Sequence, residues 1–341
     1  MWNYLKNAKK PIAIYGMGNG ADKIIDTLSD YGLKPVGVFA SDDFVRGQNF
    51  RGFTVKHYDE LKAEYPQMTV LIAFGTFRDE VLENIKKIAA ETEVLAPDVP
   101  VYGGGLFTKE YVVEHKESLE KVYNMLADEQ SKKVFENCVN YRLSGKIDYL
   151  FDCETDQKEA YENILKLKTD EIYCDLGAYN GDTIDEFLSF CGGYKKIFAL
   201  EPDKKNFKKL KAKYENKENV FLFNSAANDF SGEIGFLTNG GRHSVASDKG
   251  EKISALSLDD VLNGEKATFI KYDVEGMEEK AILGTKRTIE NYKPKMLVSA
   301  YHRTEDYFEL PLLINSIRDD YKIYMRHYKY IPAWDTQFYF V

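Results

Sequence analysis

The chain has 341 residues, a formal net charge of −9, 44% hydrophobic residues and 30% charged residues. At roughly 150 residues per domain this length favours two domains, and the composition is typical of a folded globular protein. The acidic balance argues against a nucleic-acid-binding surface, which needs clustered positive charge. No apolar run approaches the roughly 18 residues that span a bilayer. No signal peptide is expected, and four widely spaced cysteines favour a reduced, cytoplasmic protein with buried thiols.

The first hundred residues alternate strand and helix patterns. The alternation predicts a parallel sheet with helices on both faces, which we assign to an N-terminal Rossmann-like domain at residues 1–108. The expected elements are strands at 11–15, 36–39 and 69–74 and helices near 22–28 and 58–61.

A glycine-rich loop follows the first of these strands. Gly16, Gly18 and Ala21 match the pattern G-x-G-x-x-[GA], in which backbone N–H groups at a helix start can cradle a phosphate. Asp42 or Asp43, after the second strand, would be the partner acid. The segment resembles nucleotide-sugar-binding Rossmann units, which implies a carbohydrate-linked acceptor. Two alternatives stay open: a degenerate domain for assembly or acceptor docking, and an NAD- or nucleotide-sugar-dependent oxidoreductase or binding protein that uses this loop.

Residues 109–150 change in character. The stretch from 114 to 150 is charged and free of proline, with apolar residues at helical spacing such as Val122, Leu126 and Cys138. This pattern predicts a helical connector that packs on one or both domains. A cap over the substrate is the alternative, and a homodimer through these helices is conceivable.

The strand–helix alternation restarts near residue 170, in a second domain that we assign to residues 151–341. Thr183–Glu186 fits a capping box at the start of a helix. The basic run from 204 to 214 has helical spacing and is interpreted as a solvated helix face. The other expected elements are strands at 171–176, 196–200, 220–223, 267–272 and 295–299 and an antiparallel pair at 321–326 and 337–341.

A second glycine loop lies between a strand and a helix in this domain. Residues 175–182 have the spacing D-x-G-x-x-x-G, and Glu201 follows the next strand, where an acidic group can accept hydrogen bonds from ribose hydroxyls. The carboxylate of Asp175 would repel a pyrophosphate but attract the cationic end of S-adenosylmethionine. The charge of this loop therefore favours a methyl donor over a dinucleotide.

Four segments in this order resemble the FkbM family of methyltransferases: 175–182, 200–203, 224–227 and 271–278. The D-V-E-G-x-E element within the last of them is the most specific. The similarity covers about residues 120–341 and includes Tyr301-His302-Arg303 and the terminal 325–328.

The resemblance implies a class I methyltransferase sheet with S-adenosylmethionine bound by the Asp175 loop and Glu201, and with the segment after Asn224 beside the adenine. Family members mostly methylate hydroxyls of sugars, glycans or secondary metabolites, so the expected partner is a small-molecule or glycan acceptor. The donor-binding residues are expected to be Asp175, Gly177, Ala178, Tyr179, Asn180, Gly181, Asp182, Thr183, Glu201, Pro202, Asn224, Ala226 and Ala227.

Three residues are candidates for the chemistry. Asp273 and Glu275 follow the strand at 267–272, and His302 follows the strand at 295–299, so all three should meet at one rim of the sheet. Methyl transfer is a direct displacement that needs an aligned acceptor and removal of its proton. We expect His302 or Asp273 to be the general base and Glu275 to orient the acceptor.

Other interpretations of these residues remain open. Glu275 could cap a helix at 276–283, and His302 could be a structural histidine. Asp273 and Glu275 could bind a divalent metal, but the spacing provides no third ligand, so no metal site is predicted. His327 is more probable as a packing residue than as an acceptor contact, and His243 is a guess for the acceptor site.

Overall fold

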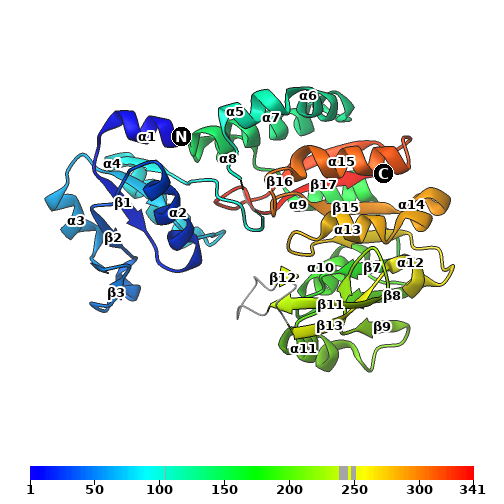
Figure 1. The fold of residues 1–341 in the computed structure, drawn as a ribbon. Helices are drawn as coiled ribbons and strands as arrows, with labels where there is room; N and C mark the ends of the chain where they lie inside the picture. Colours follow the sequence, from blue (N-terminus) through cyan, green and yellow to red (C-terminus); the bar gives the residue numbers. More distant parts are fainter. Residues whose placement is uncertain (104, 238–244, 247–250) are drawn as a thin grey trace.

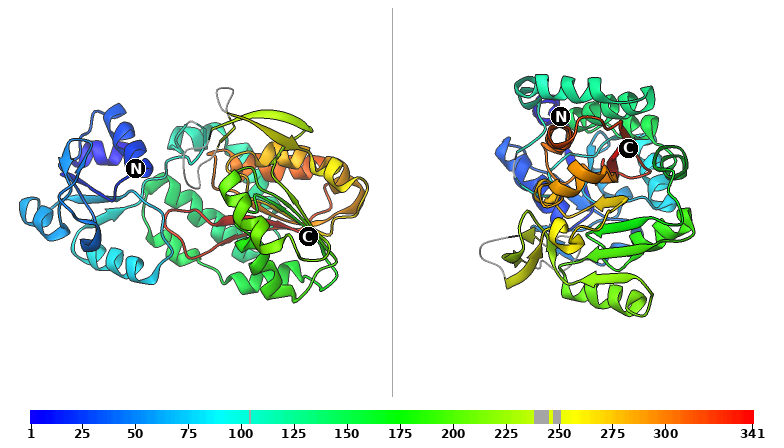
Figure 2. Two further views of the ribbon diagram at one scale, coloured as in Figure 1. Left: turned by 90° about the horizontal axis from the view of Figure 1, so that it is seen from below. Right: turned by 90° about the vertical axis from the view of Figure 1, so that its right-hand side faces the viewer.

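The computed structural model describes residues 1–103, 105–237, 245–246 and 251–341. Two α/β lobes lie side by side, each with its own sheet, and a group of helices lies between and above them (Figures 1 and 2). The predicted fold class, two Rossmann-like parallel-sheet units in one chain, is confirmed. Within the described residues, no helix is both long and apolar enough to cross a membrane.

The N-terminal lobe contains a parallel sheet covered by helices on both faces. Its elements are α1 (Trp2–Ala8), β1 (Ile12–Tyr15), α2 (Asn19–Asp30), β2 (Gly37–Phe39), η1 (Asp42–Phe44), β3 (Asn49–Phe50), β4 (Phe53–Thr54), α3 (Tyr58–Glu64), β5 (Thr69–Ile72), α4 (Asp79–Glu91) and β6 (Glu93–Leu95). The strand order is β2-β1-β5-β6, and every pair is parallel. All residues of β1 and β5 are buried, as expected for a sheet covered on both sides. The three strands predicted for this lobe are confirmed. Helix α4 and strand β6 are present but were not predicted.

The connector is helical, as predicted, and packs on both lobes. Its elements are α5 (Lys109–Glu114), α6 (Lys116–Met125), α7 (Glu129–Ser144) and α8 (Asp148–Cys153), which runs past residue 150. The short helix α9 (Gln157–Glu159) and the π-helical turn η2 (Ala160–Leu165) follow at the start of the second domain. Val122 and Cys138 belong to one buried cluster that also contains Val70 of β5 and Met325 of the C-terminal sheet. We propose the division at residues 108 and 150 as the domain boundaries.

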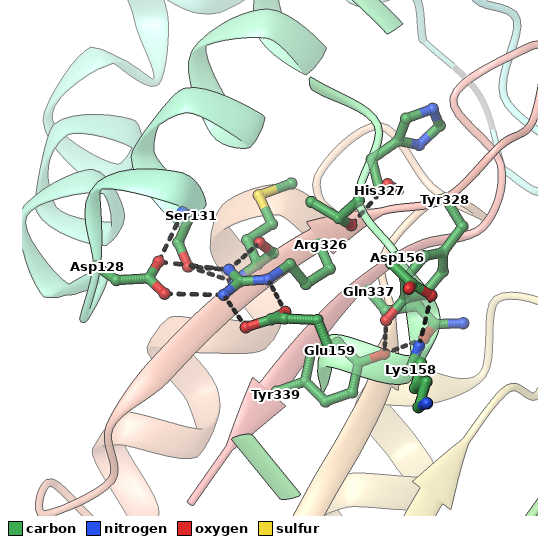
Figure 3. A network of polar contacts seen from close by, with 12 residues as sticks. Asp128, Ser131, Asp156, Lys158, Glu159, Arg326, His327, Tyr328, Gln337 and Tyr339 are labelled. Atoms are coloured by element: carbon green, nitrogen blue, oxygen red, sulfur yellow. Dashed lines mark hydrogen bonds and ion pairs between the residues drawn. The ribbon is translucent and has the colours of Figure 1, made fainter. Parts of the chain in front are cut away.

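One ion-pair cluster fastens this connector to the C-terminal sheet (Figure 3). The Arg326 side chain, 2% exposed, donates to Asp128 at the start of α7 and to Glu159 of α9. Its guanidinium also donates to the Ser131 hydroxyl over 2.9 Å. A buried guanidinium must have its donors satisfied, so these three partners fix how the connector sits on the sheet.

The C-terminal lobe is built on a seven-stranded sheet. Its elements are β7 (Ile172–Leu176), α10 (Asp182–Cys191), β8 (Lys196–Leu200), α11 (Lys204–Tyr214), β9 (Val220–Phe223), α12 (Leu258–Leu262), β14 (Phe269–Tyr272), α13 (Glu278–Leu283), α14 (Lys286–Tyr292), β15 (Lys295–Ser299), α15 (Asp306–Ile317), β16 (Ile323–His327) and β17 (Thr336–Phe340). The order is β16-β17-β15-β14-β7-β8-β9. The predicted antiparallel pair at the end of the chain is confirmed as β16 and β17. The order reverses between β7 and β14, where open α/β sheets bind ligands.

A small second sheet, which the sequence did not indicate, lies on this lobe. It consists of β10 (Ala226–Ala227), β11 (Gly232–Leu237), β12 (Val245–Ala246) and β13 (Glu251–Leu256). The central pair, β11 and β13, is antiparallel. His243, guessed to line an acceptor site, lies outside the described residues.

Two expected helix starts are wrong. Thr183 does not open a capping box, because α10 begins at Asp182 with Gly181 as its N-cap and no side-chain cap. The Thr183 hydroxyl instead donates to Asp175. Glu275 does not cap the next helix either, because α13 begins at Glu278 with Met277 as its N-cap. In both places a tight turn with positive φ precedes the helix and moves its start.

Candidate active site

A cavity of about 490 Å³ opens at the carboxyl ends of β7, β8 and β14, within the range of roughly 300–1,000 Å³ that small-molecule sites occupy. Gly177, Glu201 and Asp273, which follow these three strands, all line it. Phe77 and Val101 of the N-terminal lobe line it from the other side. Both lobes therefore contribute to one cavity at the switch point of the larger sheet.

The turn after β7 requires glycine. Gly177 has φ of 92°, and a Cβ there would lie 1.9 Å from the carbonyl oxygen of Asp273. This contact is a consequence of the pairing of β7 with β14, which brings the two strand ends together. The N–H groups of Gly177 and Ala178 both donate to the carbonyl of Leu200. The backbone of β14 can approach the loop only because no side chain intervenes.

Glu201, at the end of β8, is held by backbone donors. Its carboxylate accepts the N–H of Tyr179 over 2.9 Å and the N–H of Asp203 over 2.8 Å. The Asn224 amide donates to the carbonyls of Glu201 and Pro202 and so fixes this turn. Burial raises the pKa of Glu201 to about 8, although the hydrogen bonds from these two donors act to lower it. Each carboxylate oxygen still has a lone pair for a ligand hydroxyl.

Asp175 is placed differently from Glu201. Its side chain is fully buried, does not line the cavity, and accepts a 2.5 Å hydrogen bond from Thr183. Burial raises its pKa. The direct contact with a cationic donor group that the sequence suggested stays a prediction. Asp175 reaches the cavity through Thr183, which does line it.

The predicted donor residues fall into two groups. Those that line the cavity are Gly177, Tyr179, Asp182, Thr183, Glu201, Pro202, Ala226 and Ala227. Those that do not line the cavity are Asp175, Ala178, Asn180, Gly181 and Asn224. Members of the second group shape the turns: Gly181 has φ of 87°, and the Asn180 side chain accepts the N–H of Asp182.

The three catalytic candidates meet, as predicted. His302 Nε2 lies 3.6 Å from Asp273 Oδ1 and 3.6 Å from Glu275 Oε2. Asp273 and Glu275 line the cavity, whereas His302 is fully buried behind them. Its Nδ1 lies 2.9 Å from Glu278 Oε1. Although burial lowers it, the pKa of His302 rises to about 10 because Glu278, Glu275 and Asp273 surround the ring.

Two neighbours orient Asp273. The buried Lys271 ammonium donates to Oδ2 over 3.1 Å, and the Tyr301 hydroxyl donates to Oδ1 over 3.1 Å. Burial alone would raise the pKa of Asp273, but Lys271 and His302 hold it below its ordinary value. The carboxylate is therefore ionised and fixed in direction at the cavity wall.

The glycine turn, Glu201 and the Asp273–Glu275 rim of this site fall within a match to the family model described as the methyltransferase FkbM domain, which covers residues 175–332. This part of the chain is an FkbM methyltransferase domain. The predicted resemblance is confirmed, and the protein is a methyltransferase.

Solved structures extend the likeness in fold to the whole chain. The methyltransferase FkbM of Methylobacillus flagellatus KT is 20% identical, with a TM-score of 0.76, and the match covers 100% of this chain and 92% of that one. Fibrillarin of Aeropyrum pernix (16% identity, TM-score 0.34) covers 54% of this chain and 73% of its own. Precorrin-6y C5,15-methyltransferase of Geobacter metallireducens (14% identity, TM-score 0.34) covers 54% and 85%. No curated protein matches the sequence.

Sequence reasoning missed the far wall of the FkbM site. Tyr330, Trp334 and Asp335, from the loop between β16 and β17, also line the cavity. The Phe77 ring lies tilted against that of Tyr330, with ring centres 5.8 Å apart. The high density of aromatic residues between 328 and 340 was the sequence signal that could have revealed this part of the cavity wall. His327, by contrast, is buried and contacts Thr336, as expected of a packing residue.

The N-terminal glycine loop lies away from the FkbM site. Gly16 and Gly18 have φ of 110° and 104°, but neither they nor Ala21 line the cavity. The carboxylate of Asp42 lies 2.7 Å from the ring of His57 and is largely exposed. This acid is therefore engaged by a protein side chain.

Proposed function

We propose that this protein transfers a methyl group from S-adenosylmethionine to a hydroxyl oxygen of a sugar, glycan or secondary metabolite. The observation that carries the proposal is the convergence of the Gly177 turn, the Glu201 carboxylate and the Asp273–Glu275 rim on one cavity. A bound nucleoside needs backbone groups that come close to it and a hydrogen-bond acceptor for its ribose hydroxyls. This cavity offers both, beside a pair of carboxylates.

The donor would occupy the side of the cavity formed by the β7 and β8 loops. Glu201 accepts hydrogen bonds from the ribose hydroxyls, and the small side chains of Ala226 and Ala227 leave room for the adenine. Asp182 supplies negative charge near the cationic methionine end. Site residues that stand behind the wall, such as Asp175 and Asn224, position the loops.

The acceptor would occupy the opposite side, between the rim and the aromatic wall of Phe77, Tyr330 and Trp334. Aromatic faces of this kind suit the apolar face of a ring-shaped acceptor. Because Asp273 lines the cavity and His302 does not, we assign proton acceptance to Asp273, with His302 and Lys271 as positioning residues and Glu275 orienting the acceptor.

The oxidoreductase alternative has no comparable support, because Gly16, Gly18 and Ala21 do not line the cavity and Asp42 is paired with His57. We keep a cytoplasmic location as part of the proposal, since the four cysteines are buried free thiols that suit a reducing compartment.

Calorimetric titration with S-adenosylhomocysteine and, separately, with NAD tests the proposal. We expect one S-adenosylhomocysteine site that S-adenosylmethionine competes for, and no heat with NAD. A protein that is folded by its melting curve, takes up NAD and ignores S-adenosylhomocysteine would contradict it. Isotope-labelled methyl donor and a panel of glycosides then show whether the labelled carbon arrives on oxygen.

A further inference from the structure

Four side chains gather at the floor of the cavity in an arrangement that suits a metal ion. His302 Nε2 faces Asp273 Oδ1 and Glu275 Oε2, each at 3.6 Å, and Nδ1 faces Glu278 Oε1 at 2.9 Å. Asp273, Glu278 and His302 can each present one ligand atom within 4.8 Å of the others. Within the described ranges, no other group of three or more His, Cys, Asp or Glu residues meets this condition.

Buried polar atoms in this cluster lack hydrogen bonds. Neither ring nitrogen of His302 makes a hydrogen bond of good geometry, and Glu278 Oε2 has no partner, although both side chains are at most 1% exposed. His302 Nδ1 has a charged partner in Glu278 Oε1, 2.9 Å away. Buried polar atoms in folded proteins are almost always satisfied, so His302 Nε2 and Glu278 Oε2 point to a missing ligand. Carboxylates on three sides of an imidazole favour a cation as that ligand.

The donor set narrows the type of cation. One imidazole nitrogen with carboxylate oxygens suits Mn²⁺, Co²⁺ or Zn²⁺, whereas Mg²⁺ and Ca²⁺ prefer oxygen donors alone. Glu278 has one carboxylate oxygen 2.9 Å from His302 Nδ1 and the other without a hydrogen bond, so it can serve as one of the oxygen ligands. Its Oε1 is itself held by the N–H of Val274.

We propose that His302, Asp273 and Glu278 bind one first-row divalent cation, with Glu275, 3.6 Å from His302 Nε2, as a further carboxylate on the cavity side. His302 supplies the third ligand that the sequence did not reveal, because it reaches Asp273 and Glu275 from the neighbouring strand β15. Since both carboxylates line the cavity, the ion would lie where the acceptor enters.

The role of this cation, unlike its binding, rests on the proposed function. A carboxylate is a weak base for an alcohol, whose proton is held far more tightly than that of a carboxylic acid. A cation that binds the acceptor oxygen makes this proton easier to remove, so that Asp273 suffices as its acceptor.

The test uses tag-free, chelator-treated full-length protein and Co²⁺ alone, without any donor. We expect one equivalent of Co²⁺ by calorimetry, with visible ligand-field bands. Glu275→Gln, at a side chain 33% exposed, should weaken Co²⁺ binding by more than about tenfold, and Glu278→Gln by roughly 10–100-fold. His57→Ala removes the exposed histidine–carboxylate pair of the other lobe and should leave Co²⁺ binding unchanged.

The proposal would be overturned if the bands were absent, or if Co²⁺ bound equally well to the wild type, Glu275→Gln and Glu278→Gln. A protonated His302 would then be the positive charge that balances the carboxylates. Melting curves and S-adenosylhomocysteine titrations of the same variants separate this failure from others. If Glu275→Gln binds S-adenosylhomocysteine but not Co²⁺, the variant has lost the metal site alone. If the wild type binds Co²⁺ but not S-adenosylhomocysteine, only the proposed donor site is refuted.

Discussion

The two lobes contain the same local feature, a glycine turn between a buried strand and a helix, and of the two turns the one in the C-terminal lobe lines the cavity described above. Gly18 caps α2 and Gly181 caps α10, each with positive φ and no side-chain cap. The next strand is followed by Glu201 in one lobe, buried and held by backbone donors, and by Asp42 in the other, exposed and paired with His57. The turn provides the same backbone shape in both lobes, so we infer that the acid after the following strand decides whether a nucleoside can be held.

The largest expected effect comes from the glycine turn of the FkbM domain. In Gly177→Ala the new Cβ would meet the Asp273 carbonyl at 1.9 Å, at a backbone φ that disfavours alanine. We expect a loss of about 3 kcal/mol or more of unfolding free energy and no measurable S-adenosylhomocysteine binding. Thermal melts and calorimetry provide both readouts.

Gly18→Ala is the matched control, because Gly18 also has positive φ but has open space around its Cβ position. It should cost about 1–3 kcal/mol through backbone strain and leave donor affinity unchanged. Loss of donor binding in Gly18→Ala, or normal binding in Gly177→Ala, would reverse the comparison between the two loops.

The acid after the second strand gives the next largest effect. Glu201→Gln keeps the shape but replaces a charged acceptor, so S-adenosylhomocysteine affinity should fall roughly 10–100-fold. Asp42→Asn, the equivalent change in the other lobe, should not alter it. If the two substitutions weakened donor binding equally, the donor would not be bound where we place it.

The raised pKa of Glu201 predicts a pH dependence. With a pKa of about 8 in the empty site, the carboxyl is largely protonated at lower pH, so donor affinity should rise with pH, by up to about tenfold per unit, until about pH 8. The same shift costs stability: the folded pKa lies above the unfolded one, so stability present at low pH is lost as pH rises through about 8.

Glu201→Gln separates these two consequences. Its donor affinity should be flat over this range, and the ligand-free variant should be more stable than wild type above pH 8, by roughly 2 kcal/mol. A wild-type affinity that does not change with pH would mean that Glu201 is already ionised in the empty site. Paired melts and titrations across the pH series give the answer.

The sequence predicted the donor side of the site because it is nearly contiguous: strand, glycine turn, helix, strand, acid. It also placed β9, α11 and β15 at their observed bounds. It did not predict that Asp175 is fully buried and outside the cavity lining, since burial of one side chain in a turn depends on the neighbouring strands. The capping box at Thr183 was wrong because that hydroxyl has a tertiary partner in Asp175.

The acceptor side could not be predicted for a different reason. Phe77, Glu278, Tyr330 and Trp334 come from separate loops and helices that only the packing of the two lobes and of β15 brings together. No local spacing encodes such a meeting. The small sheet of β10–β13 was missed because β10 and β12 have only two residues each and β13 is largely exposed, so these strands lack the buried apolar runs that revealed the central strands.

The smallest expected effect on stability tests what the N-terminal lobe contributes. Phe77, just after β5, is 57% exposed yet lines the cavity, so Phe77→Ala should change the unfolding free energy by no more than about 0.5 kcal/mol. Donor affinity should be unchanged, while KM should rise for the hydroxyl acceptor that the labelled-methyl screen identifies.

Phe44→Ala is the matched control, because Phe44 is equally exposed in the same lobe but does not line the cavity. If Phe77→Ala and Phe44→Ala behave alike, the N-terminal lobe does not contact the acceptor. If they differ as expected, that lobe takes part through the loop after β5 and not through its glycine turn.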